Sequence, residues 1–253
     1  MAFKDYFSKH SPDYVKYRPR YPDALFVYLA SLCPSHQQVW DCGTGNGQAA
    51  LGLTACFRRV VATDASEAQL QQTVPHDQIT YQRAPAEASG LSDRSCDLVI
   101  VAQALHWFDL TQFYLEVRRV LKSEGVLAVW CYELMQICPE VDQQVRHYYQ
   151  SIVGDYWPVE RQLIEQRYQT IVFPFAEIES PAFSMTATWS FQQLVGYLNT
   201  WSATQRFLNQ HQKNPLEQIQ ADLAIAWGDL SACRPVVWPI HLRVGRVQNS
   251  TLQ

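Results

Sequence analysis

Short apolar runs alternate with longer amphipathic runs along the first half of the chain. The apolar runs are rich in β-branched or aromatic residues, as is typical of strands that are buried on both faces. They lie at Gln38–Asp41, Val60–Thr63, Ile79–Gln82, Leu98–Ala102 and Val126–Trp130. Between them, the spacing of apolar positions predicts helices over Gln48–Phe57, Glu67–Thr73 and Leu110–Leu121. This alternation predicts βαβ units and a mostly parallel sheet.

The second half of the chain follows a different pattern. Helical spacing predicts five helices, at Val141–Val153, Pro158–Arg167, Phe191–Leu198, Thr204–Gln210 and Pro215–Leu223. Two longer extended stretches, Glu177–Trp189 and Val236–Val247, can return to the sheet edge as an antiparallel pair. The sequence contains no internal repeat, low-complexity tract or Gly/Ser linker. One domain with a helical cap is therefore the simplest organisation.

Composition and charge narrow the class of protein. Of the 253 residues, 47% are hydrophobic and 17% are charged, which fits a globular protein with a substantial core. The formal net charge is -4, and the longest basic runs are the pairs Arg58-Arg59 and Arg118-Arg119. Binding along a phosphate backbone requires clustered Lys and Arg. Nucleic acid is therefore not expected as a partner.

The seven cysteines are odd in number and form no CxxC pair, so they indicate neither a disulfide framework nor a zinc site. Reduced, mostly buried thiols are expected, and no cluster of metal ligands predicts a metal. The N-terminal residues have no apolar run typical of a signal peptide. No apolar stretch approaches 18 residues, so no membrane span is expected. These features predict a soluble, cytoplasmic protein.

A glycine-rich segment, Val39–Gly47, ends the first expected strand and opens a helix. Its glycines follow the pattern Gly-x-Gly-x-Gly, whereas a dinucleotide-binding fingerprint requires its third glycine where this chain has Gln48. Glycine permits a sharp turn and lets a ligand lie against bare backbone. The helix start offers N–H groups to a carboxylate, and Asp41 offers a negative charge to an ammonium group. A ligand with an α-carboxylate and an α-ammonium fits this loop.

Asp64 stands at the end of the second expected strand, 23 positions after Asp41. In related nucleotide-binding folds, a carboxylate at this position accepts hydrogen bonds from both ribose hydroxyls. The alternative for the loop is an ordinary strand-to-helix turn. The glycines together with two acids at strand ends are a more specific signal for a cofactor site than the glycines alone.

Five motifs occur in a characteristic order along the chain. They are Val39-Trp-Asp-Cys-Gly-Thr-Gly-Asn-Gly47, Val61-Ala-Thr-Asp64, Ala86-Glu87, Asp97-Leu-Val-Ile-Val-Ala-Gln-Ala-Leu-His-Trp107 and Arg119-Val-Leu-Lys-Ser-Glu-Gly125. This set resembles the class I S-adenosylmethionine (SAM)-dependent methyltransferases of the type 11 group. Tyr14-Val-Lys-Tyr-Arg-Pro-Arg-Tyr-Pro22 and Gly196-Tyr-Leu-Asn-Thr-Trp-Ser202 are similar to the trans-aconitate and farnesoic-acid methyltransferase-like proteins. The likeness runs from about Tyr14 to Arg246.

The resemblance implies SAM as the cofactor, with S-adenosylhomocysteine as its product. It implies that Asp41, Gly43, Thr44 and Gly45 surround the methionine part of SAM. Asp64 is expected to hold the ribose, with Ala65 beside the adenine. Ala86 and Glu87 are expected to border the adenine, with Glu87 as an acceptor for its amino group. Gln103 is expected near the transferred methyl group.

The resemblance also implies the arrangement of the whole chain. The fold class is α/β: a Rossmann-like, mostly parallel seven-stranded sheet with an antiparallel C-terminal edge strand, a helical cap and an N-terminal helical lid. Residues 1–253 are expected to form a single domain. Within it, lid helices span 1–36, the cofactor-binding core 37–133, the cap with a returning strand 134–235, and the last strand and tail 236–253.

Substrate-binding residues are expected beyond the carboxyl ends of the strands. His106 is either a general base or a residue that hydrogen-bonds neighbouring backbone, and Trp107 is either core or a wall of the site. Tyr14, Tyr17 and Arg18 are expected to close over the cofactor, and Arg18 either pairs with a carboxylate or lies on the surface. Tyr197 and Trp201 share one helical face, which belongs to the pocket or to the core of the cap.

The predicted function is methyl transfer to a small molecule, with O-methylation of a carboxylic acid as the first hypothesis. A carboxylate is already ionised at pH 7 and needs no base, whereas a phenol or alcohol requires His106 nearby. One alternative is C- or N-methylation of a quinone, lipid or other metabolite. Another is a SAM-binding protein without catalysis. Methylation of tRNA is opposed by the lack of basic clusters.

Overall fold

The computed structural model describes residues 19–247. Its sheet has eight strands: β1 (Gln38–Cys42), β2 (Arg59–Asp64), β3 (Ile79–Arg83), β4 (Cys96–Ala102), β5 (Leu121–Tyr132), β6 (Ala176–Ile178), β7 (Phe183–Trp189) and β8 (Arg234–Arg246). The strand order is β3-β2-β1-β4-β5-β8-β6, and β7 also pairs with β8. The strands from β1 to β5 are parallel to one another, and β8 runs antiparallel to β5. The expected α/β fold with a mostly parallel sheet is confirmed.

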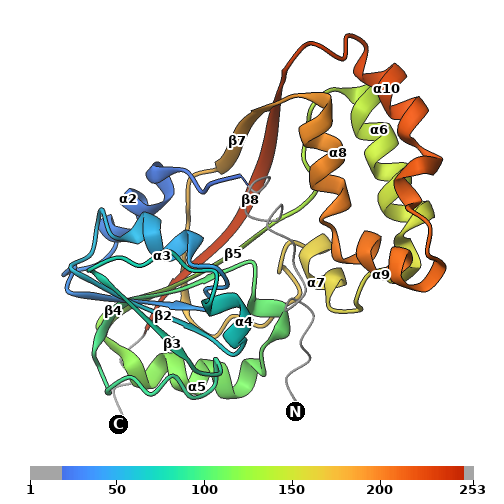
Figure 1. Cartoon of the computed structure of the whole chain (residues 1–253). Helices are drawn as coiled ribbons and strands as arrows, with labels where there is room; N and C mark the ends of the chain where they lie inside the picture. The colour runs from blue at the N-terminus through green and yellow to red at the C-terminus, as the bar shows by residue number, and fades with distance from the viewer. Residues whose placement is uncertain (1–18, 248–253) are drawn as a thin grey trace.

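The helices form two groups. Those of the first half are α2 (Asp23–Ser31), α3 (Gln48–Leu53), α4 (Glu67–Leu70), the 3-10 turn η1 (Leu105–Trp107) and α5 (Leu110–Val120). Those of the second half are α6 (Pro139–His147), the π-helical turn η2 (Tyr148–Ile152), η3 (Gly154–Tyr156), α7 (Arg161–Glu165), α8 (Phe191–Asn199), α9 (Ser202–His211), η4 (Pro215–Gln218) and α10 (Gln220–Trp227). Figure 1 shows α2 and α3 on one side of the sheet and α5 on the other.

The sheet separates two apolar cores, because both of its faces are covered. On one face, Leu25 and Leu29 of α2 pack with Val39 and Leu98. On the other face, Phe113 and other residues of α5 form a second cluster. Within the expected lid segment 1–36, α2 is therefore part of the core. Residues 1–18, and with them any lid, lie outside the described residues.

The cap helices α6, α8, α9 and α10 gather at one end of the molecule, where β7 and β8 extend from the sheet toward them (Figure 1). The start of α8 shows how the sequence determines a cap helix. Ser190 Oγ accepts a hydrogen bond from the Gln193 N–H, and Gln193 Oε1 accepts one from the Ser190 N–H, at 3.3 and 2.8 Å. These two bonds satisfy backbone donors that the first turn of a helix leaves unpaired.

The expected single stretch Glu177–Trp189 is divided in the structure, so the sheet has eight strands where seven were expected. Pro181 lies in the break, and proline has no N–H to contribute to a sheet. As a result, β6 pairs with one end of β8 and β7 with the other.

Several helices end earlier than expected. Within the stretch Pro158–Arg167, α7 ends at Glu165, before Arg167 and Tyr168, whose φ values of 56° and 57° an α-helix cannot contain. The helix expected over Val141–Val153 is divided into α6 and the π-helical turn.

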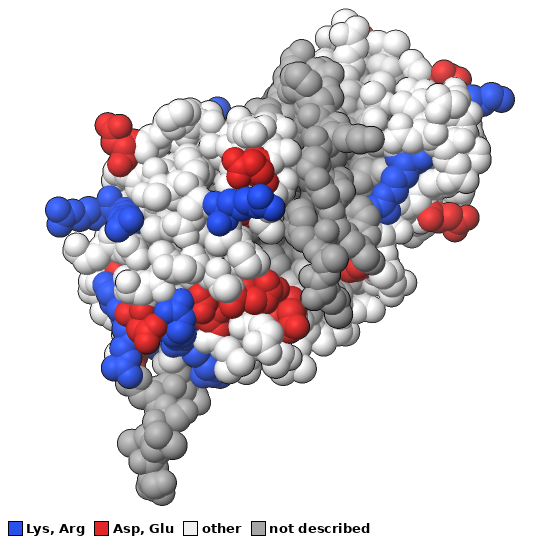
Figure 2. Space-filling model, turned by 60° about the horizontal axis from the view of Figure 1, so that its bottom comes forward, with Lys and Arg blue, Asp and Glu red and all other residues white. Residues whose placement is uncertain are grey.

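Charged side chains of both signs lie next to one another on the described part of the face drawn in Figure 2. Among the ion pairs of the described chain, Arg119 pairs with both Asp93 and Glu116. Among the helices of residues 19–247, none is long and apolar enough to cross a membrane. In the same part of the chain, no group of three or more His, Cys, Asp or Glu side chains is arranged to hold a metal.

Candidate active site

A cavity of about 1310 Å³ opens at the carboxyl ends of the parallel strands and reaches the cap. Its walls come from the segments that follow β1 to β5, together with α7 and the junction of α8 and α9. Parallel strands end at one edge of the sheet, so residues far apart in sequence meet there. The volume exceeds the roughly 1,000 Å³ of a typical site for one small ligand, which leaves room for two.

The turn after β1 forms the floor of this cavity. Gly43, Gly45 and Gly47 have φ values of 71°, 58° and 83°, in the left-handed region that favours glycine. A Cβ atom on Gly43 would lie 2.7 Å from the Cβ of Ala104, which is too close for two carbon atoms. The glycines thus allow both the turn and its close approach to the segment after β4.

Asp41 lies directly beneath this turn and is fully buried. Its Oδ2 accepts a hydrogen bond of 2.5 Å from Thr44 Oγ1, and its Oδ1 has no hydrogen-bond partner in the described chain. Burial raises the pKa of Asp41 to about 7, and the charge of Asp64 acts in the same direction, against the Thr44 hydrogen bond. Thr44 lines the cavity, whereas Asp41 does not. The structure therefore differs from the expectation that Asp41 itself borders the methionine part of SAM.

Asp64 ends β2 and lines the cavity beside Ala65. Its Oδ2 accepts the Gly45 N–H and its Oδ1 accepts the Ser66 N–H, both at 2.8 Å. These bonds fix the carboxylate at the edge of the glycine turn. A carboxylate oxygen accepts more than one hydrogen bond, and hydroxyls of a ligand are suitable donors to it.

Ala86 and Glu87 line the cavity from the segment after β3. Glu87 Oε1 accepts a hydrogen bond of 2.8 Å from the Asp109 N–H, which ties this segment to the start of α5. The Glu87 carboxylate is therefore partly engaged by the protein itself.

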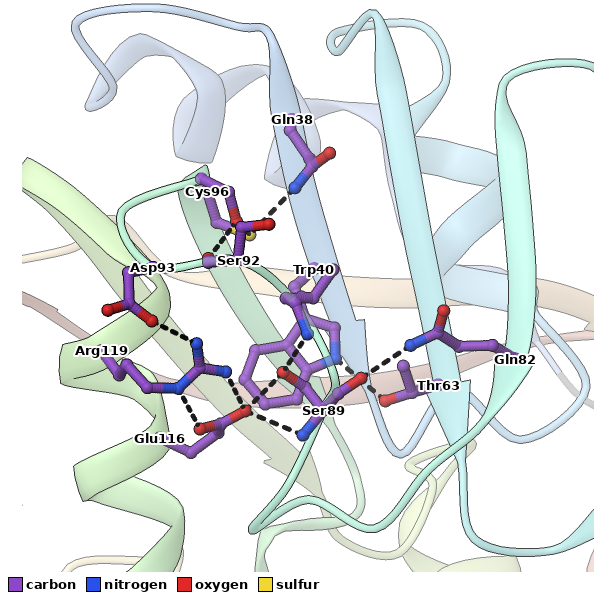
Figure 3. Close-up of polar contacts among 12 residues, drawn as sticks. Gln38, Trp40, Thr63, Gln82, Ser89, Ser92, Asp93, Cys96, Glu116 and Arg119 are labelled. Atoms are coloured by element: carbon purple, nitrogen blue, oxygen red, sulfur yellow. Dashed lines mark hydrogen bonds and ion pairs between the residues drawn. The ribbon is translucent and has the colours of Figure 1, made fainter.

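A polar network fixes the same segment from below. Figure 3 shows Glu116 between Ser89 and Arg119. Glu116 Oε1 accepts hydrogen bonds from the Ser89 N–H and hydroxyl at 2.8 and 2.5 Å, and Arg119 pairs with Glu116 at 2.7 Å. Gln82 Nε2 donates to the Ser89 carbonyl at 2.7 Å. Glu116 is buried, and these partners compensate its charge.

Gln103 lies directly after β4, with a φ of 57°. Its side-chain amide pairs with the backbone of Tyr132: Nε2 donates to the carbonyl at 3.2 Å, and Oε1 accepts the N–H at 2.9 Å. Gln103 lines the cavity, and its amide also joins the ends of β4 and β5. Its expected place near the transferred methyl group stays a prediction. The sequence around Gln103 gives no indication that its side chain pairs with the backbone of Tyr132.

His106 lines the cavity from η1 and is only 8% exposed. Its Nδ1 lies 2.8 Å from the hydroxyl oxygen of Tyr168, and its ring lies 4.6 Å from that of Trp107, which also lines the cavity. Burial, with a smaller contribution from the positive charge of Arg161, lowers the pKa of His106 to about 3. The imidazole is therefore neutral at pH 7, and so low a pKa makes it a weak general base.

Tyr197 and Trp201 line the cavity from the cap and also pack in the cap core. The Tyr197 ring lies 5.1 Å from that of Trp189, and the Trp201 ring lies 5.6 Å from that of Trp157. The two alternatives left open by the sequence, pocket and core, are both realised. The expected lid residues Tyr14, Tyr17 and Arg18 lie outside the described residues.

Arg161 is a site residue that the sequence reasoning missed. It begins α7, its Nε donates to Tyr149 Oη at 2.9 Å, and its guanidinium carbon lies 4.7 Å from the centre of the Trp157 ring. It is the one Lys or Arg among the described residues that line the cavity. Its two terminal nitrogens have no hydrogen-bond partner within residues 19–247. In the sequence, the nearby pair Trp157-Pro158 is the one sign that Arg161 lies in a cavity wall.

Four comparisons relate the chain to known proteins. Residues 40–129 match the family model of a methyltransferase domain. A methyltransferase-named protein of Dictyostelium discoideum is 34% identical over 229 residues, which cover 89% of this chain and 87% of that protein. The solved structure of a type II methyltransferase from Anaeromyxobacter dehalogenans is 43% identical, with a TM-score of 0.85, over 90% of this chain and 97% of that one. A malonyl-acyl-carrier-protein O-methyltransferase of Methylovorus sp. is 33% identical over 112 residues, 39% of this chain and 37% of that protein.

Proposed function

Because this chain belongs to the class I SAM-dependent methyltransferases, we propose that it transfers the methyl group of SAM to a carboxylate oxygen of a small organic acid. The family fixes the type of reaction but leaves the acceptor open, since acceptor choice depends on the site and not on the fold. The narrower likeness to trans-aconitate and farnesoic-acid methyltransferase-like proteins stays a prediction.

The residues at the glycine turn fit SAM. The turn leaves bare backbone at the cavity floor, Asp64 offers carboxylate oxygens at its edge, and Ala65 and Ala86 offer small apolar surface. Asp41 lies beneath the turn and does not line the cavity, and its Oδ1 has no hydrogen-bond partner among residues 19–247. We propose that Asp64 holds the ribose and that the methionine part lies along Gly43 to Gly45. When bound, SAM supplies an electrophilic methyl group, and the protein's task is to align the acceptor with it.

The observation that carries the acceptor proposal is the position of Arg161. Its guanidinium lies in the cavity on the side of the cap, close enough to His106 for its charge to lower the pKa of that residue. Tyr149 and Trp157 hold it by one hydrogen bond and two ring contacts, and its terminal nitrogens have no hydrogen-bond partner among residues 19–247. Arginine presents these nitrogens in a planar fork that matches a carboxylate. The other charged side chains of the described cavity wall are carboxylates. A neutral acceptor would not need a cation among them, whereas a carboxylate acceptor would.

The state of His106 supports the same acceptor. A carboxylate is ionised at pH 7 and needs no base, whereas a phenol or alcohol must lose a proton during transfer. His106 is buried and has a pKa of about 3, so it is poorly suited to accept that proton. The name of the Methylovorus relative refers to an O-methyltransferase, which agrees with transfer to oxygen.

Glu160 adds a feature of the acceptor. This residue lines the cavity next to Arg161, and its Oε2 is buried without a hydrogen-bond partner in the described chain. An unpaired buried carboxylate oxygen is costly, and a ligand that donates a hydrogen bond relieves that cost. We therefore propose an acid that also carries a hydroxyl or amine.

A labelled-methyl screen tests the proposal. The full chain is incubated with methyl-labelled SAM and panels of carboxylic acids, phenols, quinones, amines and tRNA. We expect label in the carboxylic acid panel alone, released as methanol by mild base because the product is a methyl ester. Base-stable label in another panel contradicts the acceptor class. Tight binding of S-adenosylhomocysteine with no label in any panel favours a SAM-binding protein without catalysis.

A further inference from the structure

Two residues 62 positions apart meet behind the acceptor side of the cavity. His106 and Tyr168 are both buried, and the His106 Nδ1 lies 2.8 Å from the Tyr168 hydroxyl oxygen. The other ring nitrogen, Nε2, has no hydrogen-bond partner within residues 19–247, and His106 lines the cavity. Tyr168 does not line the cavity. The pair thus has one member at the cavity and one behind it.

The backbone around Tyr168 is built to keep it there. Arg167 and Tyr168 both have a positive φ, a conformation that costs free energy for residues other than glycine. The turn is fixed by a hydrogen bond from the Tyr168 N–H to the Leu163 carbonyl at 2.9 Å. It is fixed also by Arg243, whose Nη1 donates to the Tyr168 and Ile171 carbonyls at 2.8 and 2.7 Å. A strained turn with this support indicates a defined task for the side chain.

The direction of the hydrogen bond between His106 and Tyr168 follows from which of the two atoms carries a proton. Burial raises the pKa of the Tyr168 hydroxyl well above its usual value, so the hydroxyl keeps its proton. That proton needs an acceptor, and among the described residues the His106 Nδ1 is the one within hydrogen-bond distance. If Nδ1 carried a proton instead, the buried hydroxyl would have no acceptor, at a cost of about 1–3 kcal/mol. Tyr168 therefore donates, and Nδ1 accepts.

We propose that Tyr168 fixes the neutral imidazole of His106 in the form that carries its proton on Nε2, so that His106 donates a hydrogen bond to the acceptor instead of removing a proton from it. Tyr168 is a positioning residue in this account, and His106 touches the substrate. The assignment rests on the proposed function only for the identity of the group that receives the bond, a carboxylate oxygen. There, the Nε2–H acts together with Arg161 to orient the acid.

Nitrogen NMR of histidine-labelled full chain tests the first half of this proposal. His106→Gln identifies the His106 signals by their loss. We expect a protonated Nε2 and an unprotonated Nδ1 in the wild type, and a mixture of the two neutral forms in Tyr168→Phe. Tyr114→Phe is the matched control, because Tyr114 is buried in the same core, its hydroxyl has no hydrogen-bond partner in the described part of the chain, and it does not line the cavity. A proton on Nδ1 in the wild type, or unchanged signals in Tyr168→Phe, overturns the proposal.

Kinetics with a methylated acid test the second half. Loss of one neutral hydrogen bond corresponds to about a 2- to 10-fold change, so Tyr168→Phe is expected to lower kcat/KM by that factor while Tyr114→Phe does not. His106→Gln, which keeps an N–H donor, is expected to retain more activity than His106→Ala. Equal loss in both variants overturns the donor role. If no acid is methylated but Tyr168 still controls the protonated nitrogen, only the carboxylate proposal fails.

Discussion

The Nε of Arg161 donates a hydrogen bond of 2.9 Å to the hydroxyl oxygen of Tyr149. Tyr149 in turn donates to Glu165 Oε1 at 2.6 Å, so its oxygen is oriented to receive the guanidinium. The π-helical turn Tyr148–Ile152 carries Tyr149, and Trp157 Nε1 donates to the Tyr149 carbonyl at 3.2 Å. The π-helical turn and α7 thus share the task of holding the cation at the cavity.

We expect Tyr149→Phe to raise KM for the acid about 2- to 10-fold, because it removes one hydrogen bond that holds Arg161. Affinity for S-adenosylhomocysteine is expected to stay unchanged. Tyr148→Phe is the control: it lies in the same turn, but its hydroxyl contacts Thr204 in the cap core. Steady-state kinetics and calorimetry measure both effects. An equal rise of KM in the two variants would point to loosening of the cap instead.

Asp64→Ala is expected to weaken S-adenosylhomocysteine binding roughly 10- to 150-fold, since a charge-assisted hydrogen bond contributes about 1.5–3 kcal/mol. Asp77→Ala is the matched control, because Asp77 is exposed and does not line the cavity. Calorimetric titration of both variants gives the comparison. Unchanged affinity in Asp64→Ala would remove Asp64 from the cofactor site.

Asp41→Asn is expected to stabilise the ligand-free protein above pH 7. The folded-state pKa of about 7 is raised from the ordinary 3.8, so the free energy of unfolding falls as the pH rises from about 4 through 7. Asparagine carries no charge and avoids this loss. We expect Tm of the variant to exceed that of the wild type clearly at pH 8 and much less at pH 5. A pH-independent difference in Tm between the two proteins would contradict the raised pKa.

Gly43→Ala is expected to lower both Tm and SAM affinity. The added Cβ meets Ala104 at 2.7 Å, and the φ of 71° is unfavourable for alanine by about 1 kcal/mol. Gly154→Ala is the control, because its Cβ would lie 3.7 Å from the nearest atom outside its neighbours and its φ is not positive. Thermal unfolding with and without S-adenosylhomocysteine distinguishes the two. If Gly43→Ala and Gly154→Ala had the same Tm, the turn would be able to move and accommodate a side chain at position 43.

The cavity wall that we assign to the cofactor was largely predictable from the sequence. Gly43, Asp64 and Gln103 lie at the ends of strands whose apolar runs are plain in the sequence, and parallel strands bring their carboxyl ends to one edge. The same reasoning placed Asp41 at the wall, whereas the structure buries it beneath Thr44. A one-dimensional pattern gives the end of a strand but not which way its last side chains point.

The acceptor side was not predictable in the same way. Arg161 begins a cap helix of five residues, Tyr168 follows that helix, and neither belongs to a motif. Their roles arise from contacts with Tyr149 and His106, which long-range packing decides. His106 was recognised at its strand end, but its low pKa depends on burial that its neighbours in sequence do not reveal.

Ester formation by the wild type and by Arg161→Met tests the central claim most directly. Methyl label released by base from an acid product is measured for both, with S-adenosylhomocysteine affinity as the check that the cofactor site is intact. Arg146→Met, an exposed arginine of α6, is the control. We predict roughly a 10- to 150-fold loss of kcat/KM in Arg161→Met alone. Unchanged ester formation in Arg161→Met, or no ester from any acid with the wild type, would contradict the account.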